Sequence, residues 1–297
     1  MGKVKPAIIA NGGAGGISFP ERRDKGLRKA VGAGYEVLRE GGTSLEAVVR
    51  AVALLEDDPI FNAGTGSVLG LTGEVEMDAS LMTSEGGFGA VAALQGVRHP
   101  IEVARLVMEK TDHILLAGEG ALRFARLMGV KTFNPVTPER KFLWRRSRKG
   151  LKSKYFQRLK ELSGYYGTVG VVALDREGRL AAGTSTGGIN LHLPGRVGDT
   201  PILGAGTYCD QNGGVSTTGH GEAIMKTFLA LRTVQLLARY PAGVAARKAI
   251  DYATQRQCRC GLVGIAKQGN ILCQENTGGM SWCYIKSGAM KSFWDNQ

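Results

Sequence analysis

The chain has 297 residues, which is long enough to bury a sizeable core as one large domain or two ordinary ones. Its apolar content of 43% and aromatic content of 7% are typical of a soluble globular protein, whereas its 44 glycines are roughly twice the usual share of about 7%. No run of 18 or more apolar residues is present, which argues against a membrane-spanning helix. We therefore expect a soluble, cytoplasmic protein without a membrane partner.

The positive charge of the chain is concentrated in one stretch. The formal net charge is +12, and no acidic residue interrupts a run of ten Lys and Arg residues between Glu139 and Glu161. This composition is typical of a mobile linker, about residues 131–167, although 152–162 has the spacing of a short surface helix. Basic residues with interleaved Phe142, Trp144 and Tyr155 leave open an alternative function in nucleic-acid binding.

Cysteine and histidine usage favours neither disulfides nor a metal hydrolase. The cysteines are odd in number, lack a CxxC pair and are expected to be reduced: Cys209, Cys258, Cys260, Cys273 and Cys283. The four histidines are scattered and form no HxxxH pattern.

Apolar periodicity predicts the elements of the first half. A short strand at the start is followed by helices near 22–39 and 43–56, the second capped by Thr43 and Ser44 ahead of Glu46. Residues 57–81 are rich in turn residues and then strand-like, and 87–95 is typical of a buried strand. Further helices are expected near 100–110 and 113–128.

The second half opens abruptly after the basic linker. The segment TVGVVALDREGRLAAGTST predicts a β-hairpin with a tight turn at 175–178. Pairing of its strands brings Thr168 close to the hydroxyls of Thr184, Ser185 and Thr186, although the pattern alone favours ordinary packed or surface threonines. Helices near 219–239 and 241–254 and strands at 261–267, 270–275 and 280–285 complete the prediction.

Two further segments carry candidate binding groups. Arg196 and Asp199, in GRVGD, suit the carboxylate and amine of an amino-acid head group, or form a surface ion pair. STTGHGE, residues 216–222, lies at the expected start of a long helix. There the unpaired amides and helix dipole would bind developing negative charge, or these residues simply cap the helix.

The order of these segments resembles the plant-type asparaginase and isoaspartyl peptidase family of N-terminal-nucleophile hydrolases. The resemblance covers almost the whole chain, from NGGAGG (11–16), DPIFNAGTGSV (58–68), MDASLM (77–82), GAVAAL (89–94) and HPIEVARLVMEKTDHILLAGEGA (99–121) to GTVG, TSTGG, GRVGD and STTGHGE. It implies an α+β fold of the four-layer αββα sandwich type, with residues 1–297 forming a single domain. It also implies self-cleavage between Gly167 and Thr168.

Cleavage would leave an α subunit, residues 1–167, whose flexible basic tail covers about 131–167, and a β subunit, residues 168–297. The family forms homodimers of such αβ units, that is, heterotetramers. Its members hydrolyse the side-chain amide of asparagine or the isopeptide bond of β-aspartyl dipeptides through a threonine acyl-enzyme, and need no cofactor for catalysis.

The resemblance assigns roles to matching residues. Thr168 would be the nucleophile, and its freed α-amine the general base. Thr186 would orient the nucleophile, and Asn62 would be its polar neighbour. Thr218 and Gly219 would form the oxyanion hole. Arg196 would bind the substrate α-carboxylate, Asp199 its α-amine, and Gly221 would make a backbone contact to the substrate. A structural sodium ion would be held by the backbone carbonyls of Leu55, Glu56, Asp58, Phe61, Ala63 and Thr65.

One departure from the family pattern lies near the scissile peptide. Most members have HGGAG, whereas this chain has Asn11 before its glycines, which puts the speed of self-cleavage in question. Glycosylasparaginase is the nearest alternative, but it typically carries an aspartate where this chain has Gly167, together with a secretory signal. A threonine endopeptidase of the taspase type is a more distant alternative, since nothing in the sequence indicates a groove for a long peptide.

Overall fold

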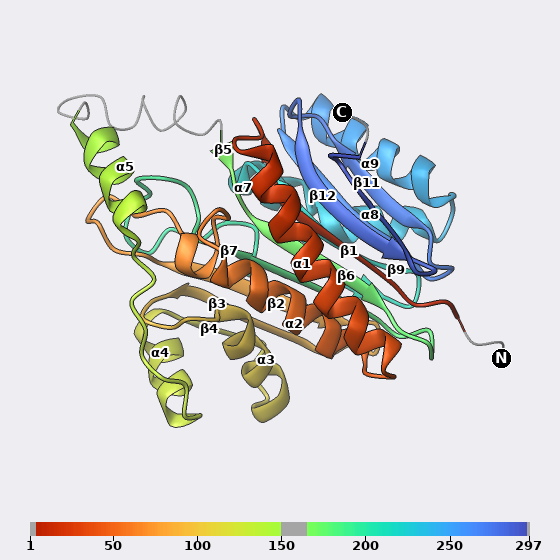
Figure 1. The fold of residues 1–297 in the computed structure, drawn as a ribbon, viewed down its shortest axis with the longest axis horizontal. Helices are drawn as coiled ribbons and strands as arrows, with labels where there is room; N and C mark the ends of the chain where they lie inside the picture. The colour runs from red at the N-terminus through yellow and green to blue at the C-terminus, as the bar shows by residue number, and fades with distance from the viewer. Residues whose placement is uncertain (1–3, 150–164, 296–297) are drawn as a thin grey trace.

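The computed structural model describes residues 4–149 and 165–295 and has a mixed α+β fold with two β-sheets (Figure 1). Up to the basic segment, the elements are β1 (Ala7–Gly15), α1 (Pro20–Arg39), α2 (Ser44–Asp57), a 3₁₀ turn η1 (Gly64–Gly66), β2 (Met77–Thr83), β3 (Phe88–Leu94), α3 (Pro100–Lys110), β4 (Leu115–Ala117), α4 (Gly118–Leu127) and α5 (Pro138–Arg148). After it come β5 (Tyr165–Tyr166), β6 (Val169–Leu174), β7 (Leu180–Thr186), β8 (Thr207–Asp210), β9 (Gly213–Gly219), α7 (Gly221–Thr227), α8 (Leu229–Leu237), α9 (Ala242–Gln255), β10 (Cys260–Ala266), β11 (Ile271–Glu275), β12 (Met280–Lys286) and β13 (Ala289–Ser292).

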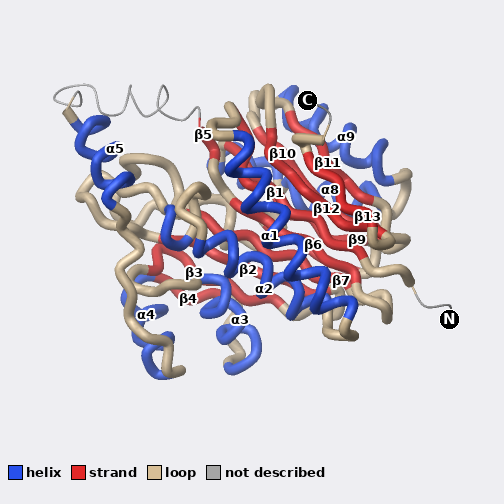
Figure 2. Tube along the Cα trace, in the orientation of Figure 1, coloured by secondary structure: helices blue, strands red, loops and turns tan. Residues whose placement is uncertain are grey.

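The larger sheet joins strands from both ends of the chain. Within the described residues its strand order is β13-β12-β1-β6-β7-β2-β3-β4 (Figure 2). The short β5 pairs with Ala14 and Gly15 at the end of β1, past the part of β1 that pairs with β6. Its neighbours are antiparallel except β3 and β4, which are parallel and connected through α3. Strands β1, β6 and β7 are buried along their whole length, because both faces of this sheet are covered.

Alternate side chains of these strands enter two different cores. Ile8 and Val171 point to the core shared with helices α1, α2 and α3, whereas Ile9 and Val172 point to the core between the two sheets. This division follows from the two-residue period of a strand. The smaller sheet, in the order β11-β10-β9-β8, contributes Ile265 to the second core and packs its other face against α8 and α9.

The predicted hairpin of β6 and β7 and the predicted cap of α2 are confirmed. The hairpin of β6 and β7 is antiparallel, and Gly178 donates its N–H to the carbonyl of Asp175 in the turn. Thr43 caps α2, since its side chain accepts from the Glu46 N–H while the Glu46 carboxylate accepts from the Thr43 N–H. All five cysteines are free thiols. No helix of the described segments is long and apolar enough to cross a membrane.

The predicted helix at 113–128 is wrong in its first turn. Leu115–Ala117 instead forms β4, a short edge strand that pairs with Ala90–Ala92 of β3. The helix begins at Gly118, whose φ of 53° is easy for a residue without a Cβ. A free edge of β3 therefore overrides the local helical pattern.

The predicted long helix at 219–239 is also wrong, because it is two helices. Ser216–Gly219 belongs to strand β9, α7 begins at Gly221, and Phe228 separates α7 from α8 with a left-handed φ of 47°. The loop before β8 supplies the reason for the break. Its carbonyls of Ala205 and Gly204 accept the first N–H groups of α8, from Ala230 and Leu231.

The expectation of a basic linker over about 131–167 is wrong for Pro138–Arg148, which form helix α5. Thr137 accepts from the Arg140 N–H and caps α5, which forms within the basic run. The helix is anchored by Trp144, whose indole N–H donates to the carbonyl of Gly70 at 2.8 Å. The surface helix predicted at 152–162 lies outside the described residues.

Candidate active site

Four strands of the larger sheet bring their ends together around Thr168. Thr168 immediately precedes β6, and Val169 pairs with Ser185 near the end of β7. Asn11 of β1 pairs with Gly170, and Asp78 of β2 pairs with Thr186. Side chains that are far apart in the sequence therefore meet around Thr168, on four neighbouring inner strands of the sheet.

The hydroxyl of Thr168 faces that of Thr186. Thr168 Oγ1 donates to Thr186 Oγ1 at 3.1 Å, and the N–H of Gly188 donates to the same Thr186 oxygen at 3.1 Å. Both threonines are buried, with 7% and 3% of their surfaces exposed. The turn after β7 thus holds Thr186 in place, and Thr186 holds the Thr168 hydroxyl.

Asn62 supports this turn. Its Nδ2 donates to the carbonyl of Gly188 at 2.7 Å and its Oδ1 accepts from the N–H of Val68 at 2.9 Å. A Cβ on Gly167 would lie 2.5 Å from the Asn62 Cβ, so Asn62 also packs against the residue before Thr168. The Asn62 amide thus bonds the backbone of Gly188 and Val68. Within the described segments, Asn62 makes no hydrogen bond to the Thr168 side chain.

The three hydroxyls at the end of β7 have separate partners. Thr186 contacts Thr168, whereas Thr184, on the same face, joins a buried network between the sheets with Thr207 and Ser216 at 2.5 and 2.7 Å. Ser185 points to the opposite face, as strand alternation requires, and donates to Glu56 Oε1 at 2.6 Å. The predicted meeting of Thr168 with these hydroxyls is confirmed for Thr186 alone.

Asn11 holds the backbone of Thr168. Its Nδ2 donates to the Thr168 carbonyl at 2.9 Å, while its Oδ1 is buried without a hydrogen-bond partner among the described residues. Gly170 is required beside it, because a Cβ there would lie 2.7 Å from Asn11 Oδ1 and 1.9 Å from Ser216 Oγ. Asn11, the residue that departs from the family pattern, therefore contacts the predicted nucleophile residue directly.

Arg196 is paired with a carboxylate that the sequence analysis did not single out. Its Nε and Nη2 donate to the two carboxylate oxygens of Glu222, each at 2.9 Å, in a bidentate ion pair. Burial alone would raise the pKa of Glu222, but the hydrogen bond and charge of Arg196 outweigh it and lower that pKa. Among residues 4–149 and 165–295, Nη1 and the second N–H of Nη2 form no hydrogen bond, so these donors are left for another acceptor.

Asp199 is a buried carboxylate next to that arginine. Burial raises the pKa of Asp199 to about 7, against the opposing hydrogen bond from Thr217 at 3.0 Å and the charge of Arg196. A Cβ on Gly221 would lie 2.8 Å from Arg196 Nη2 and 3.0 Å from Asp199 Oδ1. Only a glycine fits between the two charges. Asp78, whose Oδ2 accepts from the Gly198 N–H at 3.1 Å, anchors the loop that carries them.

Thr218 and Gly219 end strand β9. The Thr218 hydroxyl is fully buried and has no hydrogen-bond partner among the described residues. Gly219 has a φ of 147°, and a Cβ there would lie 2.4 Å from the carbonyl oxygen of Arg259. This position therefore needs glycine. The expectation that these residues lie at the N-terminus of a long helix is wrong, because they are strand residues ahead of the seven-residue α7.

A narrow cleft of about 10 Å³ joins seven residues predicted for the site: Gly167, Thr168, Thr186, Arg196, Asp199, Gly219 and Gly221. That volume is about the space of one water molecule. Asn62 and Thr218 lie outside its lining. The hydroxyls of Thr168 and Thr186 and the opposite charges of Arg196 and Asp199 thus belong to residues that line the same small cleft.

The loop after α2 was predicted to hold sodium through backbone carbonyls, and its backbone is closely folded. A Cβ on Gly64 would lie 2.3 Å from the carbonyl oxygen of Glu56, and one on Gly66 would lie 1.9 Å from that of Phe61. Two of the predicted carbonyls therefore need glycine beside them. Among residues 4–149 and 165–295, no group of three or more His, Cys, Asp or Glu side chains could hold a metal ion.

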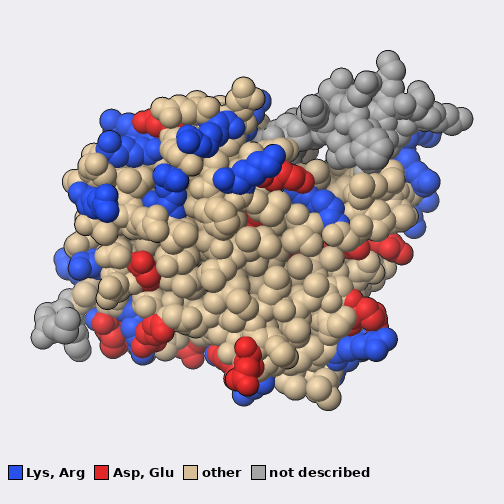
Figure 3. All heavy atoms as spheres, turned by 180° about the vertical axis from the view of Figure 1, so that it is seen from behind, with Lys and Arg blue, Asp and Glu red and all other residues tan. Residues whose placement is uncertain are grey.

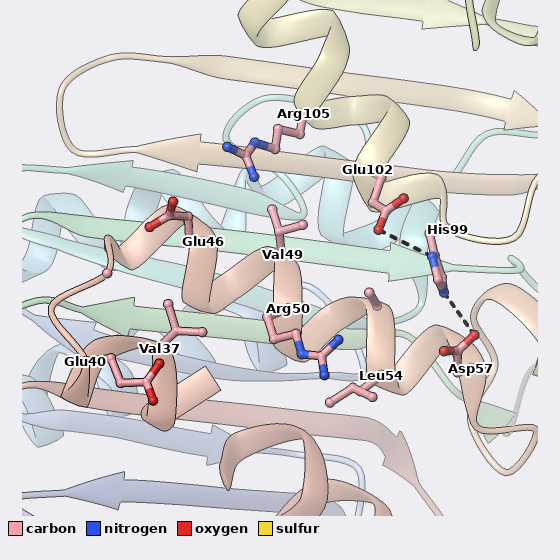
Figure 4. Close-up of a pocket in the computed structure, with 12 residues that line it drawn as sticks. Val37, Glu40, Glu46, Val49, Arg50, Leu54, Asp57, His99, Glu102 and Arg105 are labelled. Atoms are coloured by element: carbon pink, nitrogen blue, oxygen red, sulfur yellow. Dashed lines mark hydrogen bonds and ion pairs between the residues drawn. The ribbon is translucent and has the colours of Figure 1, made fainter. Parts of the chain in front are cut away.

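A larger pocket lies away from Thr168, on the helical face. It has a volume of about 540 Å³ and is lined by residues of α1, α2 and the start of α3, including Arg50, Glu46 and Arg105 (Figure 4). His99 bridges Asp57 at 2.9 Å and Glu102 at 3.4 Å. Burial would lower the pKa of His99, but the bonds to Glu102 and Asp57 together outweigh burial and raise that pKa to about 9. None of its lining residues belongs to the Thr168 cleft.

Basic side chains are not confined to the segment after Glu139. Lys and Arg also gather at the upper left of the rear face, where α8 and α9 lie when the view of Figure 1 is turned (Figure 3). Trp144, one of the aromatics considered for base stacking, is used within the protein. A Cβ on Gly73 would lie 2.9 Å from its ring, and its N–H is bonded to Gly70.

Comparison with known proteins identifies the family of this chain. The asparaginase family model matches residues 4–294. The plant-type L-asparaginases of Pyrococcus horikoshii and Thermococcus kodakarensis are 46% and 47% identical, over 95% of this chain and 97% of theirs. The isoaspartyl peptidase/L-asparaginase of Homo sapiens is 42% identical over 97% of this chain and 95% of its own. The protein is therefore a hydrolase. It belongs to the asparaginase family.

Proposed function

We propose that this protein cuts itself between Gly167 and Thr168 and then hydrolyses the side-chain amide of L-asparagine and the isopeptide bond of β-aspartyl dipeptides. The observation that carries the proposal is the Thr168–Thr186 hydroxyl pair on the cleft that also holds Arg196 and Asp199. Relatives named L-asparaginase and isoaspartyl peptidase/L-asparaginase support the same substrates. They do not favour a glycosylasparaginase or a nucleic-acid-binding protein.

Thr168 would supply both nucleophile and base. Once cleaved, it owns an α-amine with a reference pKa of about 7.7–8.0, which accepts the proton of its own hydroxyl near neutral pH. The Oγ1 then bonds to the side-chain carbonyl carbon of the substrate. Collapse of the tetrahedral intermediate breaks the C–N bond, and the proton leaves with ammonia or with the amine of the departing amino acid. Water hydrolyses the ester, releasing aspartate and restoring the hydroxyl.

Arg196 and Asp199 would hold the aspartyl head group. Glu222 occupies the Nε–Nη2 edge of Arg196, which leaves the Nη1–Nη2 edge for the substrate α-carboxylate. Ionised Asp199 would accept from the α-ammonium, and the missing side chain of Gly221 gives the substrate room for a backbone contact. Glu222 is thus a positioning residue that fixes the orientation of the Arg196 guanidinium beside the cleft.

Thr218 and Gly219 would stabilise the oxyanion. The Thr218 hydroxyl is a buried donor without a partner in the described chain, and Gly219 borders the cleft. A single donor to such an oxyanion is commonly worth about 10² to 10³ in rate. Thr186 would orient the nucleophile, and Asn62 would act indirectly by fixing the Gly188 turn.

The finer architecture belongs to the same proposal. The packing of α1, α2 and α3 on one sheet and of α8 and α9 on the other supports a four-layer αββα sandwich, formed by residues 1–297 as a single domain. Residues 1–167 and 168–297 would be its α and β subunits, two αβ units would form a homodimer, and sodium would bind the Glu56 and Phe61 carbonyls with the other predicted carbonyls of the loop.

Incubation of the purified protein tests the proposal. Two fragments should form, and N-terminal sequencing of the smaller one should read Thr-Val-Gly-Val. Cleavage by a Thr168→Ala variant at that bond would refute the assignment. The processed enzyme should release aspartate from both L-asparagine and a β-aspartyl dipeptide, and the absence of both reactions would refute the substrate class.

A further inference from the structure

A second cavity adjoins the cleft on the other side of the scissile peptide. It has a volume of about 430 Å³, and Gly167 lines both spaces, so the bond between Gly167 and Thr168 lies where they meet. Its walls combine apolar side chains, including Ile17, Val68 and Leu143, with the guanidinium groups of Arg23 and Arg140.

Helix α5 forms one wall and is held in place. Leu143, Arg140 and Ser147 face the cavity, while Trp144 donates to the Gly70 carbonyl on the neighbouring turn. This anchor lies before the proposed cut, in the part that becomes the α subunit. The wall therefore stays with the enzyme after Gly167 separates from Thr168.

Among the described residues, neither arginine forms an ion pair with a carboxylate. Arg23 donates to the carbonyls of Gly12 and Ser18 at 2.6 and 2.9 Å, and within the described residues Arg140 makes no side-chain hydrogen bond or ion pair. Burial, followed by the positive charge of Arg140, lowers the pKa of Arg23 to about 10, although the negative charge of Asp58 opposes both effects. An anion bound between the two arginines would relieve this repulsion and accept hydrogen bonds from the N–H groups of Arg140.

A buried hydroxyl on the same cavity also lacks a partner. Ser281 is 1% exposed, and its Oγ makes no hydrogen bond in the part of the chain that is described. It lines the cavity together with Asn190 and Ser147. The cavity therefore offers two cations and a free hydroxyl to an anionic, partly apolar ligand.

We propose that this cavity is a leaving-group subsite, in which Arg140 and Arg23 bind the α-carboxylate of the amino acid released from a β-aspartyl dipeptide. The inference rests on the proposed function, because it places the scissile carbonyl at Thr168 and the aspartyl head group in the cleft. The departing residue then needs a space beside Thr168, on the side where Gly167 lies in the uncut chain. Asparagine, which releases only ammonia, does not use this subsite.

The test compares β-aspartyl-leucine with its C-terminal amide, which has the same leaving side chain but no carboxylate. Arg140→Gln should lower the ratio of kcat/KM for the acid over the amide by about 10- to 100-fold, the range expected for one charged hydrogen-bond partner. Arg140→Lys should restore part of the ratio. Arg145→Gln, an exposed change on the same helix, should leave it unaltered.

An equal change for acid and amide in Arg140→Gln would overturn the carboxylate subsite. Trp144→Ala offers an independent test, because it releases α5 without touching the charge, and it should lower the same ratio. An unchanged ratio in that variant would show that α5 is no part of the site. If the unaltered enzyme hydrolyses neither dipeptide nor asparagine, the proposed function itself fails.

Discussion

Thr168 and Thr186 share a hydrogen bond of 3.1 Å between their hydroxyl oxygens, although 17 residues and a full hairpin separate them in the chain. Their approach depends on the register of β6 and β7, in which Val169 opposes Ser185. Because a shift of one residue would turn Thr186 to the opposite face, the hairpin register is part of the catalytic geometry.

Replacing Thr186 with Val should lower kcat for asparagine by about 10²-fold. Valine keeps the shape of the side chain but removes the acceptor used by both Thr168 and the Gly188 N–H, so the nucleophile loses its orientation. Steady-state kinetics on the fully processed enzyme measures the effect. Thr186→Ser, which keeps the hydroxyl, should retain most of the rate; a Val variant within twofold of the original enzyme would contradict an orienting role.

Arg196→Ala should strongly weaken substrate binding while leaving self-cleavage intact. The precursor holds no free amino acid, so the guanidinium has no head group to bind during cleavage. Loss of a bidentate charged contact predicts a fall in kcat/KM for asparagine of at least about 100-fold. Electrophoresis reports cleavage, and loss of cleavage together with activity would point to damage to the fold.

Glu222→Gln should raise KM for asparagine about tenfold with a smaller change in kcat. The variant keeps the length of the side chain but weakens the pair that orients Arg196. Glu177→Gln, on the exposed hairpin turn, is the matched control and should behave like the unaltered enzyme. A fall in kcat at unchanged KM would instead assign Glu222 to the chemical step.

Local pattern and tertiary contact explain which parts of the site were predictable. The β6–β7 hairpin is encoded in neighbouring residues, so the approach of Thr168 to the end of β7 followed from the sequence. The Arg196–Glu222 pair spans 26 residues, and no local signal links them; the acidic residue in the first turn of α7 was the available hint. Asn62 is similar, since its partner Gly188 lies 126 residues away.

Composition was misleading for α5, and for a physical reason. A run of arginines and lysines has no apolar stripe, so periodicity predicts a linker, yet one side chain anchors the helix through Gly70 and Gly73. The break at Phe228 was equally hidden, because a left-handed φ at a bulky residue arises from the bonds that the Gly204–Ala205 loop makes to α8.

Affinity for the aspartyl head group should fall as pH decreases below about 7. Burial first, opposed by Thr217 and Arg196, raises the pKa of Asp199 to about 7, and the substrate ammonium needs the ionised carboxylate. The inhibition constant of L-aspartate should therefore rise about tenfold per pH unit on the acidic side. Asp199→Asn should bind aspartate weakly at every pH; an Asn variant with the same inflection would assign the titration to another group.

Glu56 makes the fold less stable as pH rises from about 5 to 8. Burial, only partly opposed by the hydrogen bond from Ser185, raises the pKa of Glu56 to about 8 from its ordinary 4.5. Between these values the folded protein keeps a proton that the unfolded chain has lost, so stability is present at low pH and declines as pH increases toward 8. The change is on the order of a few kcal/mol, since each pKa unit corresponds to about 1.4 kcal/mol.

Glu56→Gln removes this titration while keeping the shape and the Ser185 acceptor. The urea midpoint of the variant should therefore rise relative to the original protein as pH increases from 5 to 8, with both proteins in the same processing state. Glu46→Gln is the control on the same helix: its pKa is lowered by the Thr43 cap, so between pH 6 and 8 its offset from the original protein should be constant. A constant offset for Glu56→Gln as well would show that Glu56 is ionised in the folded protein across this range.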